Sequence, residues 1–212
     1  MTVTTSDGLT PAEHRALREL FATTRQLSNH WATLAARLEP GTGDELAKGA
    51  ASARRLLDEL AERAAAFGLH GFPAAQSVGG SLSAVRNRLT DVALERNQAL
   101  RTAVLDAQHV GTLLLYLAEL ARSRGDADLA DWEESWQRRL QRHERAVRRV
   151  AVATGSDPDA AIEPLLDNPA GRAAHGVQNA VGTVGEWVDT SAVGRGVRKA
   201  VRSSRRRTPR GA

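Results

Sequence analysis

The 212-residue sequence contains no cysteine. This absence excludes disulfides, thiolate ligands for zinc or iron–sulfur clusters, and a cysteine nucleophile. Methionine occurs once, at position 1, so no internal methionine can ligate a haem iron. The sequence also lacks a run of about 18 uncharged apolar residues, and its N-terminus lacks the features of a signal peptide. We therefore expect a cytoplasmic protein that contacts a membrane at most peripherally.

Paired metal-ligand motifs are also missing. No glutamate is followed by histidine three residues later, although helical bundles with a dimetal carboxylate centre use such pairs. A mononuclear site formed by His30, His109 and His143 is an alternative, because each lies on or beside an apolar helical row. Otherwise His30 and His109 lie on partly exposed flanks and His143 is a core residue. Since no triad, calcium loop or nucleotide fingerprint is present either, we expect no catalytic residue and no cofactor.

The apolar residues recur at helical spacing along most of the chain. We expect helices over residues 11–38, 42–67, 82–124 with a break near 95–98, 126–153 and 158–166. Capping boxes predict two of the starts: Thr10 with Glu13, and Thr42 with Glu45. Asp126 or Asp128 is expected to cap the fourth helix, Asp157 the short fifth helix, and Gly68 to end the second.

Two helices carry inward rows at alternating steps of three and four residues, the spacing of a helical-bundle seam. The first row is Leu17, Leu20, Thr24, Leu27, Trp31, Leu34 and Leu38, and the second is Leu129, Trp132, Trp136, Leu140, His143, Val147 and Val150. Because the first two helices are joined by a short loop, they are expected to be antiparallel neighbours. The sequence predicts an all-α protein, an antiparallel four-helix bundle with an additional short helix.

Positive charge is concentrated at the C-terminus. From Thr190 onward the chain has eight basic residues and no acidic ones: Arg195, Arg198, Lys199, Arg202, Arg205, Arg206, Arg207 and Arg210. Subtracting these eight from 29 basic residues leaves 21 against 25 acidic residues, or −4, for residues 1–189. We expect a disordered N-terminus over 1–9, a bundle domain over 10–166, an amphipathic segment rich in glycine and valine over 167–202, and a disordered arginine-rich end over 203–212.

A basic tail on an acidic body is typical of a segment that binds an anionic surface. The tail could meet either a membrane or a nucleic-acid backbone. We favour the membrane, because Val193, Val197 and Val201 continue an apolar row among the basic residues and no aromatic residue is interleaved for base stacking. A docking peptide for a larger protein assembly, or a solvated tail without a partner, are the other interpretations.

The run Ala107-Gln108-His109-Val110-Gly111-Thr112, followed by Tyr116, Ala118, Glu119, Leu120, Ala121 and Gly125, resembles a helix of the YciF-like branch of the ferritin-like superfamily. Leu17-Arg18-Glu19-Leu20-Phe21 is similar to the first helix of that family, and Arg55-Leu56-Leu57 through Phe67-Gly68 to its second. The resemblance covers residues 15–153. It implies a four-helix bundle with an additional helix, a homodimer, a link to stress responses, and in many members a dimetal centre.

This sequence departs from the family at its metal ligands. The first-helix glutamate aligns with Thr24, the Glu-His pair with Gly111-Thr112, and the last-helix acids with Arg142-His143. We therefore expect the scaffold without the metal centre: a non-enzymatic binding or scaffolding protein whose tail contacts an anionic partner. The alternative is a metal-binding or metal-storage protein that uses His30, His109 and His143.

Overall fold

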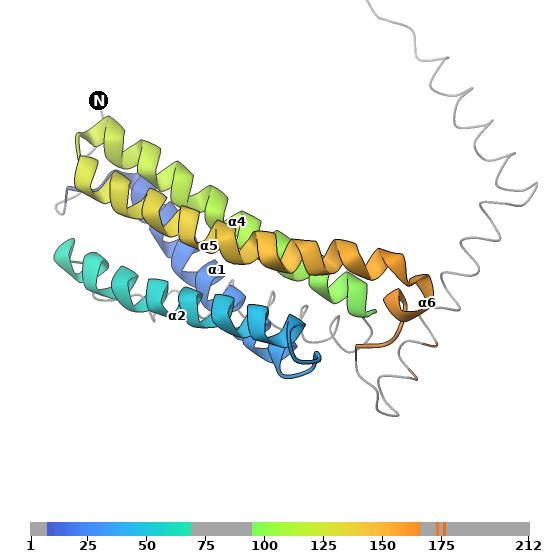
Figure 1. Ribbon diagram of the computed structural model, residues 1–212. Helices are drawn as coiled ribbons and strands as arrows, with labels where there is room; N and C mark the ends of the chain where they lie inside the picture. The colour runs from blue at the N-terminus through green and yellow to red at the C-terminus, as the bar shows by residue number, and fades with distance from the viewer. Residues whose placement is uncertain (1–7, 69–94, 166–172, 174–175, 177–212) are drawn as a thin grey trace, which may run out of the picture. The chain divides into compact units, whose positions relative to one another are not determined.

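The computed structural model describes residues 8–68 and 95–165, together with Ala173 and Gly176. The chain divides into two units after Leu166, and the helices described below belong to the first unit. They are α1 (Pro11–Ala35), α2 (Thr42–Ala66), α4 (Arg96–Arg124), α5 (Ala127–Ala153), the 3-10 turn η2 (Thr154–Ser156) and α6 (Pro158–Ala161) (Figure 1). The four long helices and one short helix confirm the all-α class. Within the described residues, none of the helices combines the length and the apolar character needed to span a membrane.

Most helix ends follow local capping chemistry. The capping box of Thr10 and Glu13 is present, Asp126 accepts a hydrogen bond from the Leu129 amide, and Asp157 accepts one from Ala160. The residue after the α2 C-cap is Gly68, whose φ of 73° lies in the left-handed region that favours glycine. These predicted ends are confirmed.

Three boundaries differ from the prediction. The N-cap of α2 is Gly41 rather than Thr42, and Asp44, not Glu45, accepts a hydrogen bond from the Gly41 amide at 3.3 Å. Helix α1 ends at Ala35, before the predicted residue 38, and α6 ends at Ala161 instead of continuing to residue 166. Helix α4 begins at Arg96, within the predicted break. The part of the third helix expected over residues 82–94 lies outside the described residues.

Each long helix packs against two others, in the cyclic order α1, α2, α5, α4. Neighbours run antiparallel. The short turn between Arg124 and Ala127 sets this for α4 and α5, and three contacts establish it for the other pairs. The Ser28 hydroxyl of α1 donates to the Ala50 carbonyl of α2, and the Trp132 indole at the start of α5 donates to Glu59 near the end of α2. Arg124, at the end of α4, contacts Glu13 in the first turn of α1.

Helices α2 and α4 consequently point in the same direction. Helices α2 and α4 end at the same end of the bundle, as a contact between their C-terminal ends shows: the Arg124 guanidinium lies over the Phe67 ring at 5.5 Å. The start of α4 lies at the opposite end of the bundle, where Arg96 forms ion pairs with Glu39, in the turn before α2, and with Glu163. The chain between α2 and α4 therefore connects opposite ends of the bundle, unlike the short α1–α2 and α4–α5 turns.

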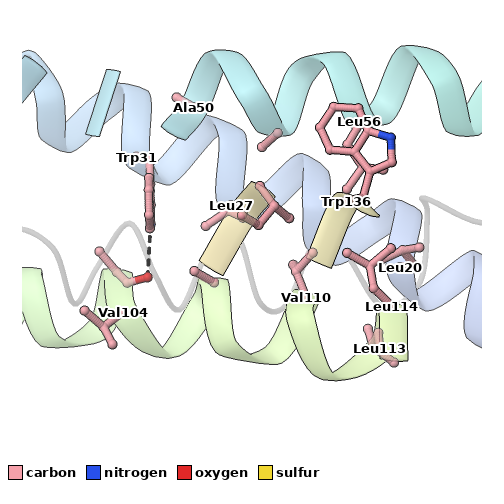
Figure 2. Packing of buried hydrophobic residues seen from close by; sticks show 14 of the residues in the cluster. Leu20, Leu27, Trp31, Ala50, Leu56, Val104, Val110, Leu113, Leu114 and Trp136 are labelled. Carbon is pink, nitrogen blue, oxygen red and sulfur yellow. Dashed lines mark hydrogen bonds between the residues drawn. The ribbon is translucent and has the colours of Figure 1, made fainter. Parts of the chain in front are cut away.

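The core is a continuous cluster of leucine, alanine and valine side chains around two tryptophans, Trp31 and Trp136, each 1% exposed. Figure 2 shows Trp31 reaching from α1 to the α4 backbone, where its Nε1 donates to the Ala103 carbonyl at 3.0 Å. Gly49 of α2 makes room for this indole, since a Cβ at that position would lie 2.1 Å from Cζ3 of Trp31. The core is thus closed by side chains from all four long helices.

Candidate functional site

The most unusual group in the described interior is the carboxyl of Glu133 on α5. The residue is 0% exposed, and no hydrogen-bond donor among the described side chains and backbone reaches either carboxyl oxygen. It lies four residues after Leu129 and three before Trp136, so it shares their inward surface. An acidic side chain in this position is rare, because transferring a charged carboxylate into an apolar interior is very unfavourable.

Burial raises the pKa of Glu133 from its ordinary value of 4.5 to about 8. The carboxylates of Glu13 and Asp126 raise the pKa further, whereas the guanidinium groups of Arg63 and Arg124 oppose the shift. Four elements thus contribute charges around one carboxyl: α1, α2, the end of α4 and the turn before α5. At pH 7 the Glu133 carboxyl is predominantly protonated and neutral.

Glu13, the second buried acid at this end of the bundle, is by contrast fully partnered. Its Oε2 accepts hydrogen bonds from the backbone amide and hydroxyl of Thr10 at 2.7 and 2.8 Å, and its Oε1 accepts from Nε of Arg124 at 3.0 Å. The guanidinium of Arg124 also donates to Asp126 at 3.1 Å. Glu13 thus has donors on both carboxyl oxygens, whereas the neighbouring Glu133 has none among the described residues.

A tryptophan pair adjoins these acids on the side of α2. Glu59 accepts hydrogen bonds from the indoles of both Trp132 and Trp136, at 2.9 and 2.8 Å on the same oxygen. The two rings meet edge to face with centroids 6.5 Å apart, and the Arg63 guanidinium lies 4.4 Å above the Trp132 ring. Aromatic rings and a shared acceptor therefore lock α5 against α2 next to Glu133.

This arrangement can hold and release a proton, but it presents no Glu133 oxygen to solvent. A general acid or base must reach the atom whose proton it transfers, and Glu133 is enclosed by packed helices. A small cleft of about 130 Å³ lies at the opposite end of the bundle, lined by Arg96, Leu100, Val150 and Thr154 among others. That volume is below the roughly 300 Å³ typical of small-molecule pockets.

The three histidines considered as metal ligands have separate surroundings. Nδ1 of His30 lies 2.5 Å from Oδ2 of Asp106, and Nε2 of His109 lies 3.2 Å from Oε1 of Glu19. His143 is half-buried between α5 and α2; burial lowers its pKa, and the cations of Arg142, Arg55 and Lys48 lower it further against the opposing effect of Glu45. His30 is 7% exposed, so placing it on a partly exposed flank was wrong. Across residues 8–68 and 95–165, no three acidic or histidine side chains form a group able to hold a metal ion.

The positions that the family resemblance assigns to metal ligands do not suit a metal either. Thr24 is wholly buried, and its hydroxyl has no hydrogen-bond partner within the described parts of the chain. Thr112 is exposed and its hydroxyl donates to the Gln108 carbonyl of its own helix, while Arg142 is also exposed. A dimetal centre needs several convergent carboxylates, and these residues supply none.

The eight basic residues of the tail, Arg195 to Arg210, lie outside the described residues. Comparison of the chain with protein-family models, with curated proteins and with solved structures gave no match.

Sequence reasoning missed Glu133 because the predicted inward row of this helix passes from Leu129 through Trp132 to Trp136 and leaves Glu133 out. A signal was nevertheless present. Glu133 and Glu144 both belong to a second row of α5 at steps of three and four residues, and all six of its members are buried: Leu129, Glu133, Trp136, Leu140, Glu144 and Val147. Of the two acids, Glu144 is bonded to Arg148 on the flank of the helix, so Glu133 is the one without a partner.

Proposed function

We propose that this protein is a non-enzymatic scaffold, a ferritin-like helical bundle without a metal centre, whose basic C-terminal segment binds an anionic phospholipid membrane. The proposal has a structural part and a binding part. The described helices support the first part, and the distribution of charge along the sequence supports the second.

The directions of the helices support a ferritin-like bundle. Two antiparallel hairpins, α1–α2 and α4–α5, pack together, and the connection between them joins opposite ends of the bundle. One long crossover between two helical hairpins distinguishes ferritin-like bundles from simple up-and-down bundles. The interior between the hairpins is filled by Trp31, Trp136 and leucine side chains, which favours a structural role for the bundle.

The observation that carries the binding part is the charge split. Eight basic residues and no acidic ones follow Thr190, whereas residues 1–189 carry a net charge of −4. Each lysine or arginine near an anionic membrane contributes on the order of 1 kcal/mol. Val193, Val197 and Val201 add apolar contacts that a bilayer accepts and a phosphate backbone does not.

Vesicle binding by the full-length chain tests this function. Vesicles of phosphatidylcholine with about one quarter phosphatidylserine should sediment the protein at low salt, and binding should fall as salt screens the charges. The variant R205Q/R206Q/R207Q should bind about 10- to 100-fold more weakly. A matched variant, R15Q/R18Q/R25Q, removes three exposed arginines of α1 and should bind almost normally. Equal loss in both variants, or no binding by the unaltered chain, would disprove the proposal.

A further inference from the structure

The outward surface of α5 carries a straight row of arginines from near its middle toward its C-terminal end. Four exposed residues follow one another at steps of four, three and four positions, which places them on one line along the helix. At 1.5 Å per residue this line is about 16 Å long. It lies opposite the buried surface of α5 that contains Trp136 and Leu140. We call these residues the α5 arginine row: Arg138, Arg142, Arg145 and Arg149.

Most of this row is not neutralised by the described part of the chain. Arg138 forms an ion pair with Glu134 at 3.2 Å, but Arg142, Arg145 and Arg149 form none with any described carboxylate. Glu144, the one acid within the span of the row, is buried and is paired with Arg148 on the flank of the helix. The row therefore presents three uncompensated guanidinium groups to solvent.

The positive region continues onto α2. The cations of Arg142, Arg55 and Lys48 all lie near enough to His143 to lower its pKa, in addition to the effect of its burial and against the opposing charge of Glu45. Lys48 and Arg55 are exposed, but Lys48 is ion-paired with Glu45 at 2.7 Å, so Arg55 is the residue that extends the positive region. Residues 1–189 are acidic in total, so an anionic surface would repel most orientations of this part of the chain and attract this one.

Two exposed apolar side chains follow the row in the sequence. Val152, three residues after Arg149, lies on the same line and is 73% exposed, and Ile162, shortly after α6, is 50% exposed. An anionic bilayer interacts favourably with both arginines and exposed apolar side chains, whereas a nucleic-acid backbone interacts favourably with the arginines alone. The combination favours a membrane.

We infer that the α5 arginine row is a second membrane-contact surface, which docks the bundle against the same anionic bilayer that the C-terminal segment binds. This inference rests on the proposed function. It adds a defined orientation: the outer surface of α5 faces the phospholipid headgroups.

The test uses three full-length variants that each lose three positive charges. R142Q/R145Q/R149Q alters the row and leaves the Arg138–Glu134 ion pair intact, R205Q/R206Q/R207Q alters the tail, and R15Q/R18Q/R25Q alters α1. Partition onto vesicles with one quarter phosphatidylserine should fall about 10- to 100-fold for the row variant, and less than about threefold for the α1 variant. Circular dichroism should show the same helix content in all three, because every substituted body residue is exposed.

Each outcome separates the two proposals. If the unaltered chain does not bind vesicles, both are wrong. If it binds and the tail variant is weakened while the row variant is not, the row is not a contact surface and the proposed function stands. If the row and α1 variants lose equal affinity, net charge alone is responsible and the row again has no special role. If duplex DNA of equal charge concentration binds in a row-dependent manner and vesicles do not, the surface is a nucleic-acid contact and the inference is overturned.

Discussion

Arg124 and Glu13 join the end of α4 to the first turn of α1, with Nε of Arg124 donating to Oε1 of Glu13 at 3.0 Å. The Glu13 side chain is 2% exposed and that of Arg124 is 23% exposed. The pair therefore lies mostly out of water, next to the neutral Glu133. If one partner of the pair is removed, the other stays buried without its counter-charge, and the resulting loss of stability can be measured.

Replacing Arg124 with methionine should lower the free energy of unfolding by about 2 kcal/mol, because a buried carboxylate then loses its main counter-charge. The backbone and hydroxyl donors of Thr10 still bind Glu13, which keeps the loss below that of a fully isolated charge. Urea denaturation monitored by circular dichroism measures the change. Arg122→Met serves as the control, since Arg122 pairs with Glu119 and Glu134 on the exposed surface. If both variants unfold at the same urea concentration, the Arg124–Glu13 contact does not stabilise the bundle.

The raised pKa of Glu133 predicts a specific pH dependence. Between about pH 4.5 and about pH 8 the carboxyl is ionised in the unfolded chain but protonated in the folded chain. The stability due to this proton is fully present below pH 4.5 and is lost as the pH rises through about 8. The full difference of 3.5 pH units corresponds to a loss on the order of 5 kcal/mol.

Glu133→Gln removes this titration and keeps the shape of the neutral side chain. The stability of the variant relative to the unaltered chain should therefore increase steadily from pH 4.5 to pH 8. Glu134→Gln is the matched control on the adjacent residue, where a hydrogen bond from Arg122 lowers the pKa. Its relative stability should change in the opposite direction, decreasing as the pH rises through the titration of Glu134. Denaturation at several pH values gives the free energy of unfolding as a function of pH. If that dependence is the same for the unaltered chain and for Glu133→Gln, the pKa of Glu133 is not raised.

Two helical glycines should respond oppositely to alanine. At Gly49 an added Cβ would lie 2.1 and 2.3 Å from the buried Trp31 ring, so the indole must move and its hydrogen bond to Ala103 is disturbed. Gly49→Ala should destabilise the protein by about 1 to 3 kcal/mol. At Gly111 the nearest atom to an added Cβ is 3.9 Å away, on Gln137, so Gly111→Ala should stabilise α4 by about 0.5 to 1 kcal/mol. Thermal unfolding of the two variants gives the signs directly.

Glu59 should stabilise the protein through its two indole donors. Glu59→Ala leaves Nε1 of Trp136 without its acceptor in a residue that is 1% exposed, and should cost about 1 to 3 kcal/mol. Glu62→Ala provides the control, because Glu62 is an exposed glutamate less than one turn away on the same helix. Chemical denaturation should separate the two variants clearly. Similar midpoints would mean that the shared acceptor does not hold α5 against α2.

Features that depend on a few neighbouring residues could be predicted from the sequence. The box of Thr10 and Glu13, the caps at Asp126 and Asp157, and the left-handed Gly68 are local, because each involves atoms at most a turn apart. The incorrect prediction at the start of α2 also concerns only neighbouring residues. The Asp44 side chain accepts a hydrogen bond from the Gly41 amide. The N-cap therefore lies one residue before Thr42, the position that the predicted capping box gave it.

The inward surface of α5 was decided by tertiary structure. Trp132 and Glu133 lie about 100° apart on the helix, and either of them can stand between Leu129 and Trp136 in a row with the spacing of a buried seam. Glu59 and Arg63 of α2 hold Trp132 at the edge of the interface, and this contact turns Glu133 inward toward Glu13 and Arg124. The same packing directs the α5 arginine row to solvent.

The sequence alone thus determined that the chain is helical, where most of its helices start and stop, and that its positive charge is gathered at one end. These properties follow from propensity, capping and composition, which act over a few residues. Only the tertiary structure decided that the α2–α4 connection joins opposite ends of the bundle, that Glu133 is an enclosed neutral acid, and that three arginines of α5 form no ion pair with a described carboxylate. These properties depend on side chains of helices far apart in sequence, because burial and charge pairing are set by the neighbours that packing supplies.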